Sequence, residues 1–479
     1  MKLAQSFDPE LPVRLGDGVG KEMAACNRVN GLHCVNNYDL LVKMPPLLPW
    51  GRGGFCFCRI MFRKGEICFM NENLRRDAEA IIRQAISAVT PAFAVEKALK
   101  DRRFPGRVYL VAAGKAAWKM ADTAARTLGE TLTAGVVVTK YGHAERPIPK
   151  VVCHEGGHPV PDEQGVAGTQ AALELTRDLG PEDTVLFLLS GGGSALFEKP
   201  LIPMEELKSI TGQMLAAGCD IVEINTVRKR LSAVKGGRFA AWCAPARVVS
   251  IVLSDVLGDP LDMIASGPTV PDRSTCGQAM EVVRKYGLRL SAEAETCLQK
   301  ETPKELQETE THIIGSVREL CRAAAEAGEA LGYTPVLLTD QLCCEARDAG
   351  SFLASILKTH ASDGRKTAFL AGGETVVHLS GTGLGGRNQE MALAAAQGIA
   401  GLSNAAVICV GSDGTDGPTD AAGGYADGDT LQALSEENLS YTAMMENHDA
   451  YHALEAVGGL IKTGPTGTNV NDIAVALIG

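Results

Sequence analysis

The chain has 479 residues, a formal net charge of −11 at pH 7 and 53 glycines, whereas only 5% of its residues are aromatic. This length corresponds to two or three domains of ordinary size, and the glycine-rich balance is typical of α/β enzymes. The acidic charge excludes a general nucleic-acid-binding protein, which needs a basic face to displace counterions. No apolar run reaches the roughly 18 residues of a membrane span, and the N-terminus lacks the order of a signal peptide. We therefore expect a cytoplasmic protein that binds small molecules, either as a monomer or as an oligomer.

The 14 cysteines are scattered along the chain. None stands in the paired C-x₂-C arrangement of a structural zinc site, and Cys343 and Cys344 are adjacent rather than spaced for ligation. Cysteines distributed in this way are typical of a reducing compartment, where they pack as small hydrophobic residues. This pattern agrees with a cytoplasmic location.

Residues 1–69 differ in character from the rest of the chain. They hold five of the 14 cysteines, carry nine Lys and Arg against six Asp and Glu, and show no sustained period. Residues 63–66 (Arg-Lys-Gly-Glu) can be encoded by a purine-rich, ribosome-binding type of sequence, three codons before Met70. We interpret residues 1–69 as a translated leader and Met70 as the native start. A genuine, poorly ordered extension is the alternative, and the nucleotide sequence decides between the two.

From Met70 onward, short apolar runs alternate with helical patterns. An amphipathic run extends to Leu99 with a break at Pro91. The predicted strands cover 108–112, 135–139, 184–189, 247–253, 334–338, 367–370, 376–379 and 406–410, and predicted helices include 116–128, 165–178 and 388–400. The strands are continuous apolar runs, which indicates parallel sheets covered by helices.

A polar segment at 300–312 is poor in core residues and predicts a domain boundary. We therefore expect an α/β fold of two domains, a Rossmann-like N-terminal domain over 70–305 and a C-terminal domain over 306–479. Both are expected to hold largely parallel sheets covered by helices. A cleft between two such domains is a common place for a ligand, so we expect the active site there.

Two patterns resemble metal-binding motifs without their context. Residues 154–158 (His-Glu-Gly-Gly-His) match the zinc-protease pattern, but the two glycines and the following Pro159 and Pro161 predict a loop instead of the required helix. Residues 411–420 resemble a calcium loop but lack the terminal Glu and the flanking helices of an EF-hand. We set both metal sites aside, and the sequence also contains no P-loop pattern.

Residues 381–386 (Gly-Thr-Gly-Leu-Gly-Gly) match the G-x-G-x-x-G pattern between a predicted strand and a predicted helix. This is part of the context of a dinucleotide-binding fingerprint. However, the helix opens with the charged and amide-rich cluster 387–390, and no acidic residue ends a strand about 20 residues further on. A loop that binds phosphate or clamps a substrate explains the same glycines, so Gly385 and Gly386 are candidate binding residues.

Two loops at strand ends in the N-terminal half predict an anion site. The strand at 108–112 runs into Gly114 and Lys115, which places an ammonium beside free helix N–H groups; a surface lysine is the alternative. The strand at 184–189 is followed by Ser190, Gly191, Gly192, Gly193 and Ser194. These glycines allow backbone N–H groups to point inward as a nest for phosphate or carboxylate.

A cationic helix is a further candidate for anion binding. Arg228 and Lys235 are seven residues apart, a spacing that would place both on one face of a helix. Asn225 lies shortly before them in the same segment. Such side chains can line an anion site, although a solvated helix face is the alternative.

Carboxylates follow several predicted strands. Asp255 lies just beyond the strand at 247–253, where a Mg²⁺–nucleotide complex requires a carboxylate; a turn-forming aspartate is the alternative. In the C-terminal half, Glu374, Arg387 and Asp413 lie in polar, glycine-rich loops and are candidate site residues.

Together these motifs resemble the type II glycerate kinases, whose C-terminal portion is called the MOFRL domain. The resemblance extends from about Met70 to Gly479, and residues 1–69 find no counterpart in it. The segments that carry it are 112–116, 157–162, 190–195, 225–237, 254–268, 372–375, 385–390, 411–417 and 466–472.

The resemblance implies a kinase that uses ATP and Mg²⁺ to convert D-glycerate to 2-phosphoglycerate. The family's catalytic lysine and arginine correspond to Lys115 and Arg387, which we expect to neutralise the γ-phosphate and the substrate carboxylate from opposite domains. The other candidates named above are expected to bind substrate or phosphate, and Asp255 to bind the metal. Two alternatives remain: an NAD(P)-dependent hydroxypyruvate reductase, which rests on the loop 381–386, and a non-catalytic sensor of an organic acid.

Overall fold

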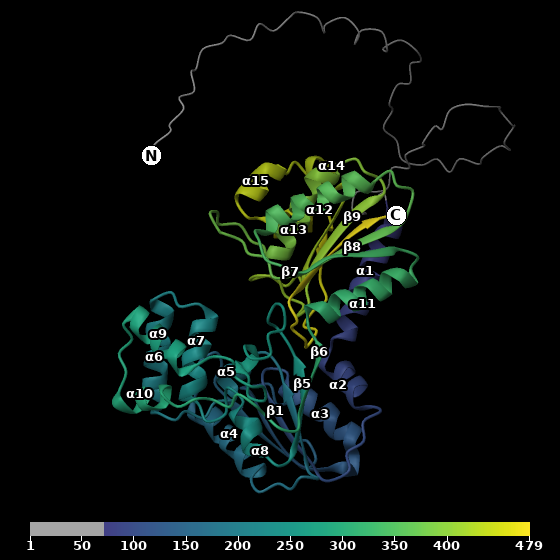
Figure 1. The fold of residues 1–479 in the computed structure, drawn as a ribbon. Coiled ribbons are helices and arrows are strands. Elements are labelled where there is room, and N and C mark those ends of the chain that lie inside the picture. The colour runs from purple at the N-terminus through teal and green to yellow at the C-terminus, as the bar shows by residue number, and fades with distance from the viewer. Residues whose placement is uncertain (1–70) are drawn as a thin grey trace, which may run out of the picture. The chain divides into compact units, whose positions relative to one another are not determined.

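Two six-stranded sheets, each covered by helices, form the framework of the protein (Figure 1). The computed structural model describes residues 71–479, and the interpretation of 1–69 as a leader lies outside the described residues. The predicted α/β fold with two sheet-based domains is confirmed.

The first sheet is entirely parallel and has the order β3-β2-β1-β4-β5-β6. Its strands are β1 (Val108–Ala113), β2 (Leu132–Lys140), β3 (Val151–Gly156), β4 (Thr184–Leu189), β5 (Arg247–Leu253) and β6 (Thr309–Gly315). One face is covered by α2 (Pro91–Leu99) and α3 (Ala117–Leu128), and the other by α4 (Glu163–Leu175) and α8 (Arg238–Cys243). Because both faces are covered, β1 and β4 are buried along their whole length, which explains their continuous apolar sequences.

A helical layer with its own hydrophobic cluster is inserted between β4 and β6. It contains α6 (Met204–Ala216), α7 (Ile221–Arg228), α9 (Cys276–Tyr286) and α10 (Ala292–Leu298), and the short helix α5 (Gly193–Leu196) precedes it. Three single-turn 3₁₀ helices among the described residues are η1 (Gly129–Thr131), η2 (Lys229–Leu231) and η3 (Ile264–Ser266).

The second sheet is mixed and has the order β11-β10-β9-β12-β8-β7. Its strands are β7 (Thr334–Leu342), β8 (Thr367–Gly373), β9 (Ala405–Gly411), β10 (Gly423–Asp427), β11 (Leu460–Ile461) and β12 (Asp472–Ile478). Only the β7–β8 pair is parallel, so the expected parallel arrangement describes the first sheet but not the second. A central strand covered on both faces is apolar whichever way it runs, and its sequence therefore does not reveal its direction.

Helices also cover both faces of the second sheet. One face is covered by α1 (Glu72–Ala88) and α11 (Val317–Ala330), and the other by α12 (Ala346–His360) and α13 (Arg387–Ile399). The helices α14 (Thr430–Glu436), α15 (Tyr441–Glu446) and α16 (Ala450–Ala456) pack outside α13. The predicted strand at 376–379 is not formed, and Val376 makes only an isolated bridge with Glu345.

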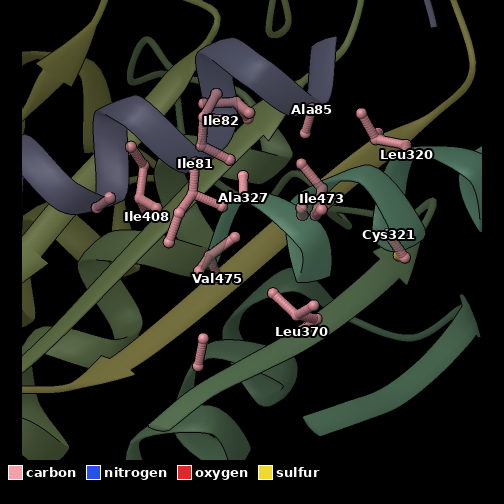
Figure 2. Close-up of a cluster of buried hydrophobic side chains, with 14 of the residues drawn as sticks. Ile81, Ile82, Ala85, Leu320, Cys321, Ala327, Leu370, Ile408, Ile473 and Val475 are labelled. Carbon is pink, nitrogen blue, oxygen red and sulfur yellow. The ribbon is translucent and has the colours of Figure 1, made fainter. Parts of the chain in front are cut away.

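The first described helix, α1, packs on the second sheet. Its residues Ile81, Ile82 and Ala85 contact α11 and the strands β8, β9 and β12 in one buried cluster (Figure 2). The predicted limits 70–305 and 306–479 divide the chain in order, whereas the packing interleaves it, since α1 belongs to the second core and β6 to the first sheet.

Within residues 71–479, no helix has both the length and the apolar character needed to cross a membrane. The cysteines in this part of the chain are all free thiols: Cys153, Cys219, Cys243, Cys276, Cys297, Cys321, Cys343, Cys344 and Cys409.

Candidate active site

The carboxyl edge of the first sheet gathers Lys115, Ser190 and Asp255, each in the loop that follows a strand. In a parallel sheet these ends lie at one edge, where ligands of α/β proteins bind. The backbone N–H of Lys115 donates to Gly191 O at 2.8 Å, and the N–H of Ala116 donates to Ser190 Oγ at 3.0 Å. The two loops predicted to bind an anion are therefore joined to each other.

The glycines of the Ser190–Ser194 loop are required by close packing. A Cβ at Gly191 would lie 2.2 Å from Asp255 Oδ2. Gly192 has φ +85°, and a Cβ there would lie 2.9 Å from the His158 ring and 3.2 Å from Lys115 Cγ. The loop thus packs against the side chains of Lys115, His158 and Asp255, and a side chain at either glycine position would force these neighbours to shift.

Lys115 and Asp255 are both available to a ligand. Neither side chain forms a hydrogen bond or ion pair with another described residue of 71–479. Burial raises the pKa of Asp255 above its ordinary value, although the charge of Lys115 opposes this shift. A partly buried carboxylate without a partner, beside an unpaired ammonium, is suited to bind a cation and an anion that arrive together.

His158 belongs to this group and was missed as a site residue in the sequence. It follows β3, a strand that the sequence did not predict, and the segment 157–162 was assigned to the family resemblance without a role for His158. Burial, followed by the charges of Lys115 and Lys140, lowers the pKa of His158 below its ordinary value of 6.5. These effects favour the neutral imidazole. A recognised strand before His158 would have placed it at the edge of the sheet.

The predicted helix face shared by Arg228 and Lys235 is wrong, because α7 ends at Arg228 and Lys235 lies beyond it, but both side chains contact the end of the Ser190–Ser194 loop. The fully buried ammonium of Lys235 donates to Ser194 O at 2.9 Å, and Arg228 Nη2 donates to the same carbonyl at 3.0 Å. Burial lowers the pKa of Lys235 to about 8. Asn225 Oδ1 accepts a hydrogen bond from Ser266 Oγ at 2.7 Å. All three contact the chain itself, and direct binding of a ligand by these side chains stays a prediction.

At one edge of the second sheet, Arg387 begins α13 and is held by two carboxylates. Its Nε donates to Asp472 Oδ2 at 2.5 Å, its Nη2 to Asp472 Oδ1 at 3.1 Å and its Nη1 to Glu374 Oε1 at 2.8 Å. Burial disfavours the guanidinium charge, but the hydrogen bonds to Asp472 outweigh burial and raise the pKa of Arg387. Since a guanidinium has five N–H donors, two are left for a ligand.

Asp416, which the sequence analysis did not select, caps the N-terminus of α13. Its carboxylate accepts hydrogen bonds from the backbone N–H groups of Asn388 at 3.2 Å and Gln389 at 2.8 Å. A Cβ at Gly386 would lie 2.2 Å from this carboxylate, which explains the glycine. Burial raises the pKa of Asp416 to about 6 despite these hydrogen bonds. The N–H groups that an anion would use at this helix are thus already occupied.

The loop 381–386 is packed against the segment that connects α15 to α16. The backbone N–H groups of Thr382 and Gly383 donate to Asn447, and that of Leu384 donates to Asp449. A dinucleotide fingerprint needs such N–H groups free to bind the pyrophosphate. Their internal hydrogen bonds disfavour the reductase alternative.

A cavity of about 500 Å³ adjoins Arg387 and is lined entirely by the second domain. It brings together four of the predicted residues, Gly385, Gly386, Arg387 and Asp413. The other residues along its wall are Thr375, Val376, Val377, Leu379, Gly383, Glu390, Thr415, Asp416, Gly417, Pro418 and His448. Glu374, which the sequence also predicted, contacts Arg387 and accepts a hydrogen bond from Asn471 at 3.1 Å.

The structure is thus a two-domain α/β protein with a candidate anion site on each sheet, the glycine-rich loop with Lys115 on the first and Arg387 on the second. The chain matches the domain of unknown function DUF4147 over residues 77–299 and the MOFRL family over residues 367–472. It is 49% identical over 419 residues to the D-glycerate 2-kinase of Thermotoga maritima. This alignment covers 86% of this chain and 100% of that protein.

A second relative and a solved structure support the same assignment. The glycerate 2-kinase of Pyrococcus horikoshii is 38% identical over 440 residues, covering 85% of this chain and 98% of that protein. The crystal structure of the Thermotoga maritima glycerate kinase matches with a TM-score of 0.82 over 85% of this chain and 100% of that one. The chain belongs to the glycerate 2-kinase family with a MOFRL domain, as the sequence motifs indicated.

Proposed function

We propose that the protein transfers the γ-phosphoryl group of ATP to D-glycerate and releases 2-phospho-D-glycerate and ADP. The observation that carries this proposal is the packing of Lys115, whose ammonium pairs with no other described residue, against the glycine-rich loop at Ser190–Ser194. Family membership supports the reaction class, since the Thermotoga maritima and Pyrococcus horikoshii relatives are named glycerate 2-kinases.

Phosphoryl transfer depends on positioning and on neutralising charge on the transferred group. Lys115 would stabilise negative charge in the transition state, while the loop N–H groups would hold an anionic group of the substrate. Arg387 would add a permanently charged guanidinium, whose orientation is fixed by Asp472 and Glu374. Arg228 and Lys235 would hold the Ser194 carbonyl and thereby keep the nest in shape.

The residues present fit a magnesium ion bound together with a nucleotide. No group of three or more potential ligands for a metal occurs in the described part of the chain, but Mg²⁺ is commonly held by one or two carboxylates plus phosphate oxygens. Asp255 supplies such a carboxylate, since its side chain is mostly buried and unpaired. When bound, the ion would neutralise the phosphate charges of ATP.

The test is a coupled ADP-release assay on the full chain with D-glycerate, ATP and Mg²⁺, in which phosphorus NMR identifies the product. Glycerate-dependent ADP together with 2-phosphoglycerate is the expected result. Without turnover of glycerate, oxidation of NADH by hydroxypyruvate would establish the reductase alternative. Binding of glycerate without any turnover would establish the sensor alternative.

A further inference from the structure

The cavity beside Arg387 is larger than the acceptor substrate requires. Its volume of about 500 Å³ falls within the range of about 300–1,000 Å³ that is typical of sites for cofactor-sized ligands. A three-carbon acid fills only a small part of such a space, and the glycine nest on the first sheet already offers a compact anion site.

One wall of the cavity is apolar and exposed. Val376 is 46% exposed and Leu379 is 74% exposed, and Pro418 also lines the cavity. The sequence 376–379 predicted a buried strand. In the structure the side chains of Val376 and Leu379 belong to none of the hydrophobic clusters of the described residues, and the segment forms only an isolated bridge instead of a strand. Exposed apolar side chains that border a cavity indicate a surface for an apolar ligand group.

The backbone of this wall is fixed independently of its side chains. The N–H of Val376 donates to Cys344 O at 3.0 Å, and its carbonyl accepts from the N–H of Ala346 at 2.9 Å. The wall therefore keeps its position when the side chain of Val376 is replaced, which makes this residue suitable for a test.

The remaining walls carry carboxylates. Glu390 is buried and hydrogen-bonded to His448 Nδ1 at 2.8 Å, and Asp413 and Asp416 also line the cavity. Carboxylates are suitable acceptors for the hydroxyl and amino groups of a nucleoside, which carry no charge.

The position of Arg387 indicates where the phosphate groups of a bound ligand would lie. Asp416 occupies the N-terminus of α13, so a phosphate chain cannot bind to these N–H groups. The two unused N–H donors of Arg387 are the remaining cationic donors among the residues that line the cavity. A triphosphate attached to a group inside the cavity would thus extend toward Arg387.

We infer that this cavity of the second domain binds the nucleoside of the ATP donor, with the base against Val376 and Leu379 and the phosphates directed to Arg387. The inference rests on the proposed kinase function for the identity of the donor. The cavity then explains why exposed apolar side chains, carboxylates and a held arginine occur together.

Isothermal titration calorimetry of the full chain tests this assignment with two ligands, the ATP analogue AMP-PNP with Mg²⁺ and D-glycerate. The variant Val376→Glu introduces a charge into the apolar wall. We expect it to weaken AMP-PNP binding at least 10-fold, about the effect of losing 1.4 kcal/mol, and to leave D-glycerate binding unchanged. Phe352→Glu is the matched control, because Phe352 is an exposed apolar residue of the same domain that does not line the cavity.

Each other outcome overturns the inference. Weaker D-glycerate binding with unchanged AMP-PNP binding would assign the cavity to the acceptor. Unchanged binding of both ligands would exclude a nucleoside there. The same conclusion would follow if AMP-PNP did not bind to the native chain. If Val376→Glu lowers the melting temperature strongly, Leu379→Glu replaces it. Failure of the proposed function would look different. In that case Val376→Glu would still lose AMP-PNP binding selectively, but the native protein would not phosphorylate glycerate.

Discussion

Asn471 donates a hydrogen bond from its side-chain amide to the backbone carbonyl of Asp255 at 3.2 Å. The same amide donates to Glu374 Oε2, and Glu374 in turn accepts from Arg387. A single side chain on the second sheet therefore links the carboxylate loop of the first sheet to the arginine of the second. This arrangement connects the two sets of predicted site residues.

Removing the Asn471 amide should impair catalysis without unfolding the protein. Asn471 has φ +66°, which glycine adopts freely, so Asn471→Gly keeps the backbone and deletes only the link. We expect kcat/KM to fall about 10-fold, or about 1.4 kcal/mol, for loss of the hydrogen bonds that position both loops. Asn438→Gly, at an exposed position with φ +58°, is the control and should keep full activity. Equal kinetics for the two variants would contradict a role for the link.

Lys115→Met should abolish most of the activity and leave the fold intact. The ammonium forms no hydrogen bond or ion pair among residues 71–479, so its removal breaks no such contact, although it also removes a charge that lowers the pKa of Asp255. We expect kcat to fall about 10²–10³-fold, as for loss of one group that stabilises transition-state charge. Steady-state kinetics and thermal melting measure the two effects, with Lys208→Met on α6 as the control. Unchanged turnover would refute the catalytic assignment.

Gly192→Ala should disturb the nest through a single methyl group. At φ +85° a Cβ is strained by about 1–2 kcal/mol. It would also push against His158 and Lys115. Displacement of these groups by about 1 Å is expected to lower kcat/KM about 10²-fold. Gly212→Ala is the matched control, because no atom lies within 4 Å of its Cβ. That change should leave activity intact and stabilise α6 by about 0.5–1 kcal/mol.

The sequence was most informative where a buried strand ends in a glycine-rich loop. Both limits of β4 and β5 were predicted, and so were the loops at Ser190 and Asp255. The strand β12, the cap of α13 by Asp416 and the hydrogen bonds of Asp472 to Arg387 were not predicted, because they depend on contacts between segments distant in the chain. His158 was missed for a related reason, since β3 is a partly buried strand at the edge of the sheet and lacks the continuous apolar run of a central strand.

The pH titration of His158 reports the charge around the nest. Its pKa lies below the ordinary value because burial and the charges of Lys115 and Lys140 disfavour the imidazolium. Lys140→Met removes one of these charges, so the pKa should rise toward 6.5. Proton NMR of the imidazole, assigned with His158→Gln, measures the shift, and Lys208→Met should not change it. A titration at or above 6.5 in the native protein would contradict the described environment.

The packing of α1 makes the stability of the second domain depend on the start of the described chain. Ile81 of α1 is fully buried against α11 and the second sheet (Figure 2). Ile81→Ala should lower the free energy of unfolding by about 2–5 kcal/mol, from lost apolar burial and the cavity left behind. Arg83→Ala, on the exposed side of the same helix, should change it by less than about 0.5 kcal/mol. Urea unfolding measures both values, and equal effects would mean that α1 is not part of the second core.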